Sequence, residues 1–149
     1  MAITETYGDM LVSSCHTLVC PTNCVGVMGA GLARTIREVY PEVFRDYRRL
    51  YLEGELQIDR LFVLTVDDHR DILIFPTKTH WRYPSKLSWI ATNLAWLAHH
   101  YDELGITSLA IPPVGCGHGG LDFHQQVKPL VYQHLGKLEI PIELYLPET

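Results

Sequence analysis

The residues from Asn23 to Gly31 read NCVGVMGAG, and they lie between an apolar run at 18–20 and a segment with helical periodicity that begins at Leu32. Three glycines in this stretch let the backbone turn tightly and approach a ligand without a Cβ in the way. A glycine-rich turn from a strand into a helix presents free N–H groups and the positive end of the helix dipole. Such a turn typically binds an anion, most often a phosphate. The stretch therefore predicts a strand, a phosphate-binding loop and a helix.

The glycine spacing does not fit two well-known nucleotide-binding motifs. No Gly-Lys-Ser/Thr follows, as the phosphate loop of nucleotide hydrolases requires, and the order is G-x-x-G-x-G rather than the dinucleotide fingerprint G-x-G-x-x-G. The alternative is a glycine-rich loop that only turns a corner.

Hydrophobic patterning along the chain predicts an α/β layered fold in one domain over residues 1–149. Apolar runs bounded by turn residues predict strands at 3–7, 18–20, 61–66, 72–75, 108–111 and 142–146, with Pro21 and Pro76 ending the second and fourth. Helical spacing predicts helices at 32–40, from Pro41 to Gly54, after a Ser85 N-cap to Gly105, and after Asp122 through Leu138, with Pro129 predicting a kink or a late start. Buried strands joined by helices place helices on both faces of the sheet.

Composition limits the classes of function. A net charge of −5 and a pI near 5.8 disfavour a grip on long stretches of duplex nucleic acid. No apolar run is long enough for a membrane span and no signal-peptide pattern begins the chain, so we expect a cytoplasmic protein. The four cysteines lack zinc-site spacing, which favours reduced thiols and no metal.

A second glycine loop, GCGHGG at 115–120, follows the predicted strand at 108–111. In open α/β sheets, ligands bind beyond the carboxyl ends of the strands, near the point where the strand order reverses. Both glycine loops are expected at that edge, where they would hold a diphosphate from two sides. Asn23 and Lys78, which also follow predicted strands, are expected in the same cleft.

Lys78 is a candidate catalytic residue. The neighbouring Phe75, Pro76 and Trp81 favour partial burial, and a desolvated lysine loses proton affinity and becomes a nucleophile towards an anomeric carbon or a carbonyl. The alternative is an ordinary surface lysine after a strand.

Other polar residues near these loops have simple structural explanations. Asp122 with Gln125 resembles a capping box, although its carboxylate beside the second loop could also act as an acid or base. Asp9 after the first strand either caps a turn or accepts a hydrogen bond from an exocyclic amine. His118 either contacts a ligand or closes its loop.

Basic and aromatic side chains alternate after Lys78. No acidic residue occurs between Asp71 and Asp102, whereas His80, Trp81 and Arg82 follow one another. Such a mixture suits a single-stranded or flipped nucleotide, whose phosphates pair with cations while a base stacks on a ring. The alternative is a solvated loop with one buried tryptophan.

Four motifs together make the chain resemble a macrodomain, and most of all the DNA ADP-ribosyl glycohydrolase antitoxin group. They are GDM at 8–10, NCVGVMGAGLA at 23–33, FPTKTHWR at 75–82 and IPPVGCGHGGLDF at 111–123. The resemblance spans nearly the whole chain and implies a three-layer α/β/α fold with a mixed central sheet.

The resemblance implies ADP-ribose as ligand and product, with no metal or cofactor. It implies that Lys78 takes part in cleavage, either by attack at the anomeric carbon or by positioning and polarising the bond. It places Asn23 near the distal ribose and Asp122 at an acidic position used by related protein glycohydrolases. With a DNA substrate, the basic and aromatic stretch after Lys78 predicts His80, Trp81 and Arg82 as nucleic-acid contacts. The implied ligand-binding residues are Asp9, Met10, Gly26, Val27, Met28, Gly29, Ala30, Gly31, Val114, Gly115, Cys116, Gly117, His118, Gly119, Gly120 and Leu121.

The implied substrate is ADP-ribose attached to thymine in single-stranded DNA. Two alternatives remain: a hydrolase acting on ADP-ribosylated protein or small ADP-ribose esters, and a reader module without turnover. A cognate ADP-ribosyltransferase toxin is the implied protein partner. Antitoxins of this group often carry a further C-terminal domain for it, so the sequence leaves open whether this chain is an excised domain or a free-standing one.

Overall fold

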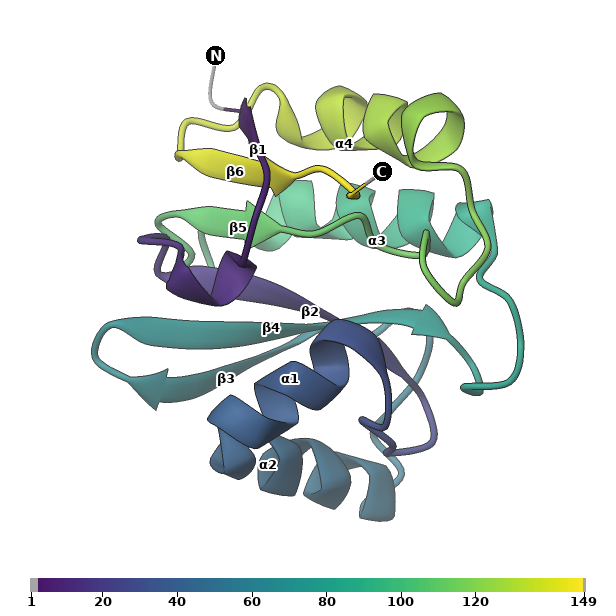
Figure 1. Ribbon diagram of the computed structural model, residues 1–149. Coiled ribbons are helices and arrows are strands. Elements are labelled where there is room, and N and C mark those ends of the chain that lie inside the picture. The colour runs from purple at the N-terminus through teal and green to yellow at the C-terminus, as the bar shows by residue number, and fades with distance from the viewer. Residues whose placement is uncertain (1–2, 149) are drawn as a thin grey trace.

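A six-stranded sheet forms the middle layer of the computed structural model, which describes residues 3–148 (Figure 1). The strands are β1 (Ile3–Thr6), β2 (Thr17–Asn23), β3 (Phe62–Asp67), β4 (Arg70–Lys78), β5 (Leu109–Ile111) and β6 (Ile142–Tyr145). The helices are α1 (Gly31–Val39), α2 (Pro41–Leu52), α3 (Leu87–His100) and α4 (Lys128–Leu135), with short helical turns η1 (Met10–Val12) and η2 (Phe123–Val127).

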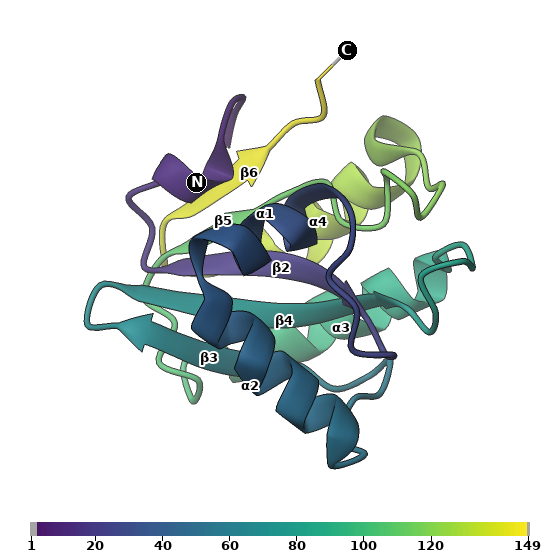
Figure 2. The same ribbon diagram turned by 60° about the horizontal axis from the view of Figure 1, so that its bottom comes forward.

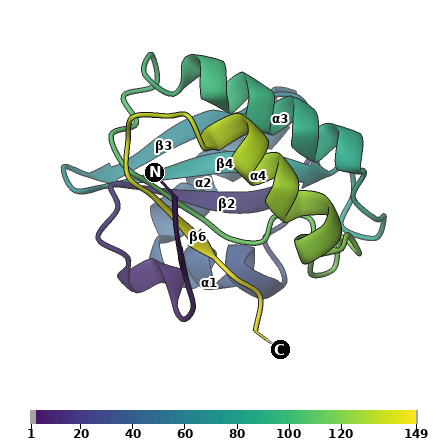
Figure 3. The same ribbon diagram turned by 90° about the horizontal axis from the view of Figure 1, so that it is seen from above.

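The strand order is β1-β6-β5-β2-β4-β3, and only β3 runs antiparallel to its neighbour. The predicted mixed sheet in a three-layer fold is therefore confirmed. Helices α1 and α2 cover one face, whereas α3 and α4 cover the other (Figures 1, 2 and 3). None of the helices described is long and apolar enough to cross a bilayer.

Alternate residues of the central strands supply two separate hydrophobic cores. Leu18 and Cys20 of β2 belong to the core under α1 and α2, whereas Val19 between them belongs to the core under α3 and α4. The strands therefore read as unbroken apolar runs because both sheet faces are covered.

Strands β2 and β4 continue past the prolines that were predicted to end them. Beyond Leu18, β2 has no partner in β5, and beyond Ile74, β4 has no partner in β3. Pro21 and Pro76 thus lie where one side of each strand is an edge, and a proline there costs no ladder hydrogen bond. The two strands pair with each other as far as Asn23 and Lys78.

Two predictions about helix starts have different outcomes. Pro129 lies in the first turn of α4, after η2, so the predicted late start is confirmed. Ser85 is not the N-cap of α3, since Lys86 occupies that position without a side-chain bond. Ser85 is buried instead, and its backbone N–H donates to the Gly119 carbonyl at 3.0 Å.

Candidate functional site

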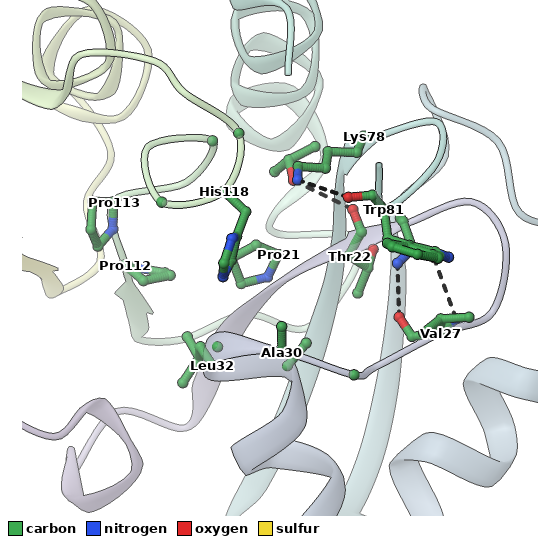
Figure 4. Close-up of a pocket in the computed structure, with 18 of the residues that line it drawn as sticks. Pro21, Thr22, Val27, Ala30, Leu32, Lys78, Trp81, Pro112, Pro113 and His118 are labelled. Atoms are coloured by element: carbon green, nitrogen blue, oxygen red, sulfur yellow. Dashed lines mark hydrogen bonds between the residues drawn. The ribbon is translucent and has the colours of Figure 1, made fainter. Parts of the chain in front are cut away.

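A cavity of about 1040 Å³ opens beyond the carboxyl ends of β2, β4 and β5, which are parallel neighbours in the sheet (Figure 4). Its walls come from the two glycine loops, the first turn of α1 and the segment after β4. Its lining residues are Pro21, Thr22, Asn23, Val27, Gly29, Ala30, Gly31, Leu32, Ala33, Thr77, Lys78, Trp81, Arg82, Pro112, Pro113, Gly115, Gly117, His118 and Gly119.

Asn23 holds the first glycine loop in shape. Its Oδ1 accepts hydrogen bonds from the Val25 and Val27 N–H groups at 3.1 and 3.4 Å, and its Nδ2 donates to the Val27 carbonyl at 2.8 Å. The buried Tyr47 hydroxyl of α2 donates to Asn23, with its oxygen 2.6 Å from the backbone oxygen and 2.9 Å from Oδ1. Burial raises the pKa of Tyr47, so this phenol remains a donor.

The first turn of α1 lies where the sequence predicts an anion site. Ala30 is the N-cap and has no side-chain cap, so no side chain occupies the free N–H groups of this turn. Gly31, Leu32 and Ala33 follow it, and all three line the cavity. The exposed N–H groups and the positive end of the α1 dipole are therefore directed to where a phosphate would bind.

Gly26 has a packing role in the same loop. Its φ is +73°, and a Cβ at this position would lie 2.8 Å from the Tyr51 ring. Gly29 is different: the only atom within 4 Å of its hypothetical Cβ is Val27 Cγ1, at 3.4 Å. Of these two glycines, only Gly29 leaves open space for a ligand.

The second glycine loop faces the first across the cavity. Gly119 packs tightly, since a Cβ there would lie 2.3 Å from the Gly115 oxygen and 2.4 Å from the Ser85 Oγ. His118 is exposed and extends from the loop into the cavity (Figure 4). The Ser85–Gly119 hydrogen bond ties this loop to the segment that follows β4.

Lys78 lies beside Asn23, as predicted, because the two residues are register partners at the ends of β4 and β2. Its Nζ donates to the Trp81 carbonyl at 3.2 Å (Figure 4). Partial burial lowers the pKa of Lys78 below its ordinary value, because desolvation disfavours the charged form. A neutral amine is thus easier to form here than on an open surface.

The basic and aromatic residues after Lys78 form the rim of the cavity. Trp81 is 48% exposed, stacks on His80 with ring centroids 5.2 Å apart, and carries the Arg82 guanidinium 4.8 Å from its ring centroid. The predicted alternative of a buried tryptophan is wrong. Trp81 and Arg82 line the cavity, whereas His80 lies behind them and accepts the Arg82 N–H at its Nδ1.

The carboxylates of Asp9 and Asp122 both accept backbone hydrogen bonds as caps, which is the structural role that the sequence offered for each. Asp9 accepts the Leu11 N–H at 2.9 Å, and Asp122 accepts the Gln125 N–H at 2.9 Å. Neither lines the cavity. Their contacts with ADP-ribose, and the acid–base role of Asp122, remain predictions.

Other residues expected to bind ligand also lie behind the cavity wall. Met10, Met28 and Val114 are buried in the core, and the remaining three support the turns of the second loop: Cys116, Gly120 and Leu121. Sequence reasoning missed seven lining residues, which lie at strand ends, at a loop start and in the first turn of α1: Pro21, Thr22, Leu32, Ala33, Thr77, Pro112 and Pro113. Their only signal is adjacency to the glycine loops and Lys78.

Comparison with known proteins agrees with this arrangement. The family model described as Macro domain matches residues 19–129. A DNA ADP-ribosyl glycohydrolase from Mycobacterium tuberculosis is 40% identical over 148 residues, which are 97% of this chain and 42% of that protein. The chain thus spans about two-fifths of the length of the curated relatives it matches.

Two solved structures are similar to the chain throughout. The macrodomain of Mycobacterium tuberculosis DarG is 39% identical, with a TM-score of 0.89 and 98% of each chain covered. Thermosipho africanus DarTG in complex with ADP-ribose is 36% identical, with a TM-score of 0.90, and the match covers 97% of this chain and 41% of that one.

Proposed function

This chain belongs to the macrodomain family, and from that premise we propose that it binds ADP-ribose and removes it from thymine in single-stranded DNA. The observation that carries the proposal is the pairing of Asn23 and Lys78 at the mouth of a cavity that also contains the uncapped start of α1. One wall thus binds phosphate while an amine faces the sugar end of the same ligand.

The diphosphate is the group that the glycine loops fit. Free N–H groups at the start of α1 would bind it on one side, and the loop around Gly117 to Gly119 would close over it on the other. Asn23 has one amide hydrogen left after its bond to Val27, and it can donate this hydrogen towards the distal ribose. A cavity of about 1040 Å³ accommodates a nucleotide of this size.

Lys78 supplies the chemistry in this proposal. Its neutral amine attacks the anomeric carbon of the distal ribose, forming a C–N bond as the bond to the base breaks. The base leaves with the electron pair and takes up a proton, and water then releases ADP-ribose and restores the amine. The alternative role, in which a charged Lys78 positions and polarises the scissile bond, predicts an opposite pH dependence.

The rim favours DNA over protein as the carrier of the modification. The Trp81 ring is exposed. The Arg82 guanidinium forms no ion pair with a carboxylate of residues 3–148. A flipped base can stack on the ring while the flanking phosphate pairs with the guanidinium. This rim is basic in a protein whose net charge is −5.

ADP-ribose can be removed from DNA only after another enzyme has attached it. We therefore propose an ADP-ribosyltransferase toxin as the functional partner, with this chain reversing the damage as an antitoxin in the same compartment, the cytoplasm. The reaction as proposed uses no metal, so EDTA should leave the rate unchanged.

The decisive assay compares an oligonucleotide carrying ADP-ribosylated thymine with an ADP-ribosylated protein. We expect release of ADP-ribose from the oligonucleotide at a much higher kcat/KM. Lys78→Ala should abolish release and keep ADP-ribose binding, and Lys78→Arg, which keeps the charge but cannot form a neutral amine, should behave like it. Full activity in Lys78→Ala would eliminate the lysine mechanism, and faster release from protein would reassign the substrate.

A further inference from the structure

The outer face of the first glycine loop carries a second pair of basic and aromatic residues, formed by Arg48 and Tyr51 of α2. The Arg48 guanidinium carbon lies 5.1 Å from the Tyr51 ring centroid, and its Nη1 donates to the Gly26 carbonyl at 3.5 Å. The Tyr51 ring packs on Gly26, where a Cβ would lie 2.8 Å away, yet 37% of the residue stays exposed. Because Gly26 has no side chain, the Tyr51 ring packs directly against the first glycine loop.

The same combination of an arginine over an aromatic ring occurs in the segment that follows β4. There, Arg82 lies over the exposed Trp81 at 4.8 Å. Val27, the residue after Gly26, lines the cavity, and Figure 4 shows it on the same side of the cavity as Trp81. Each guanidinium-covered ring therefore lies next to residues that line the same cavity: Trp81 lines it directly, and Tyr51 packs on Gly26, the residue before Val27.

Arg48 and Arg82 also share an electrostatic property. Arg34, Arg49 and Arg60 are paired with carboxylates at 2.7–3.9 Å, whereas no carboxylate among residues 3–148 lies within 4.0 Å of the guanidinium of Arg48 or Arg82. An arginine stacked on an aromatic ring without an acidic partner keeps its donors for an external anion.

We propose that Arg48 and Tyr51 form a second nucleotide subsite, which binds a nucleotide flanking the modified one in single-stranded DNA. A base stacks on the exposed part of Tyr51, and its phosphate takes the free donors of Arg48. The strand then crosses the mouth of the cavity from Trp81 and Arg82 over Val27 to Tyr51. This inference rests on the proposed function, because it deepens the choice of DNA as substrate.

The test separates binding of the strand from binding of ADP-ribose. A fluorescent, unmodified single-stranded oligonucleotide is titrated with the protein in the presence of saturating ADP-ribose, and ADP-ribose affinity is measured separately by calorimetry. Replacing a stacking aromatic ring typically lowers single-strand affinity about 5- to 150-fold, and we expect Tyr51→Leu to fall in that range. The conservative variant Tyr51→Phe keeps the ring and should retain the affinity that Tyr51→Leu loses.

Arg48→Gln gives a second, independent readout. Loss of one phosphate contact should reduce the slope of log affinity against log salt by about 0.7 for a single strand. The matched control is Arg49→Gln, which removes the same charge from the same helix at an arginine already paired with Asp46 and Glu53. It should leave both the slope and the affinity close to those of the unaltered protein.

The outcomes are distinct. If Arg48→Gln and Tyr51→Leu weaken oligonucleotide and ADP-ribose binding equally, the two residues only support the glycine loop and the subsite is refuted. If the unaltered protein cleaves the modified oligonucleotide and both variants do so with the same kcat/KM, the subsite is refuted while the proposed function stands. If the unaltered protein does not cleave that oligonucleotide, the proposed function fails and this inference fails with it.

Discussion

Replacing Gly29 with valine should abolish ADP-ribose binding without unfolding the protein. Gly29 lines the cavity, and its φ lies outside the left-handed region, so an L-residue fits the backbone without strain. The nearest atom to the new Cβ would be Val27 Cγ1 at 3.4 Å, an ordinary contact. The valine methyl groups would therefore occupy open cavity space rather than push on the protein.

The expected loss of affinity follows from the contacts that the side chain blocks. Each hydrogen bond from a backbone N–H to a charged phosphate contributes about 1.5–3 kcal/mol. If the valine keeps the diphosphate from two such donors, about 3–6 kcal/mol is lost, which weakens binding at least about 100-fold. Stability should hold or rise slightly, because replacing a glycine at a compatible site restricts the unfolded chain.

Calorimetric titration with ADP-ribose, together with the thermal midpoint of each protein, measures both effects. Gly119→Val is the informative contrast, because its Cβ would overlap the Gly115 carbonyl at 2.3 Å and the Ser85 Oγ at 2.4 Å. That variant should lose stability as well as binding. A folded Gly29→Val protein that binds ADP-ribose within about threefold of the unaltered chain would refute the two-loop site.

Three further predictions concern the residues around the cavity. If neutral Lys78 is the nucleophile, the single-turnover rate should rise with pH as the amine loses its proton, and then level off. The pKa of this rise should lie below the ordinary 10.5, because burial lowers the pKa of Lys78. A rate that falls over the same pH range would support the charged, polarising role. Asn23→Ala should lower the free energy of unfolding by about 2–4 kcal/mol in urea titrations. The reason is that the first glycine loop loses its hydrogen bonds to the Asn23 side chain and the Tyr47 hydroxyl loses one of its two acceptors. An unchanged urea midpoint would contradict the structural role of Asn23. Asp122→Ala should lower the free energy of unfolding by about 0.5–2 kcal/mol, because the helix cap is lost. Asp122→Asn should keep both the cap and the turnover. A large loss of turnover in Asp122→Asn, without a loss of stability, would establish that Asp122 acts as an acid or base.

Local signals were enough to place most elements and the chemistry of the loops. The glycine stretch ending at Gly31, the apolar runs of the strands and the periodicity of α1 to α3 are short-range features, and the structure has each where the sequence predicts it. Lys78 was a candidate because its apolar and aromatic neighbours in the sequence favour partial burial, which lowers the proton affinity of an amine. Its position beside Asn23 followed from the rule that parallel strands end at one edge.

Errors arose where a long-range neighbour changes what a residue does. Pro21 and Pro76 read as strand ends, yet β2 and β4 continue because each has one free side at that point. Ser85 read as a helix cap, yet its N–H bonds the distant Gly119 carbonyl and its side chain is buried against that loop. A sequence pattern contains no information on which strand edge is open or which loop lies opposite.

By itself, then, the sequence determined the six strands, the two glycine loops and the amine at the end of β4, because backbone freedom, periodicity and residue chemistry are local properties. Only the tertiary structure decided that Asn23 and Lys78 are register partners, that Gly26 seats Tyr51 while Gly29 faces open space, and that Asp9 and Asp122 lie outside the cavity wall. These facts depend on the order β5-β2-β4 and on packing between residues far apart in the chain, and such contacts form only when the sheet and its helical layers come together.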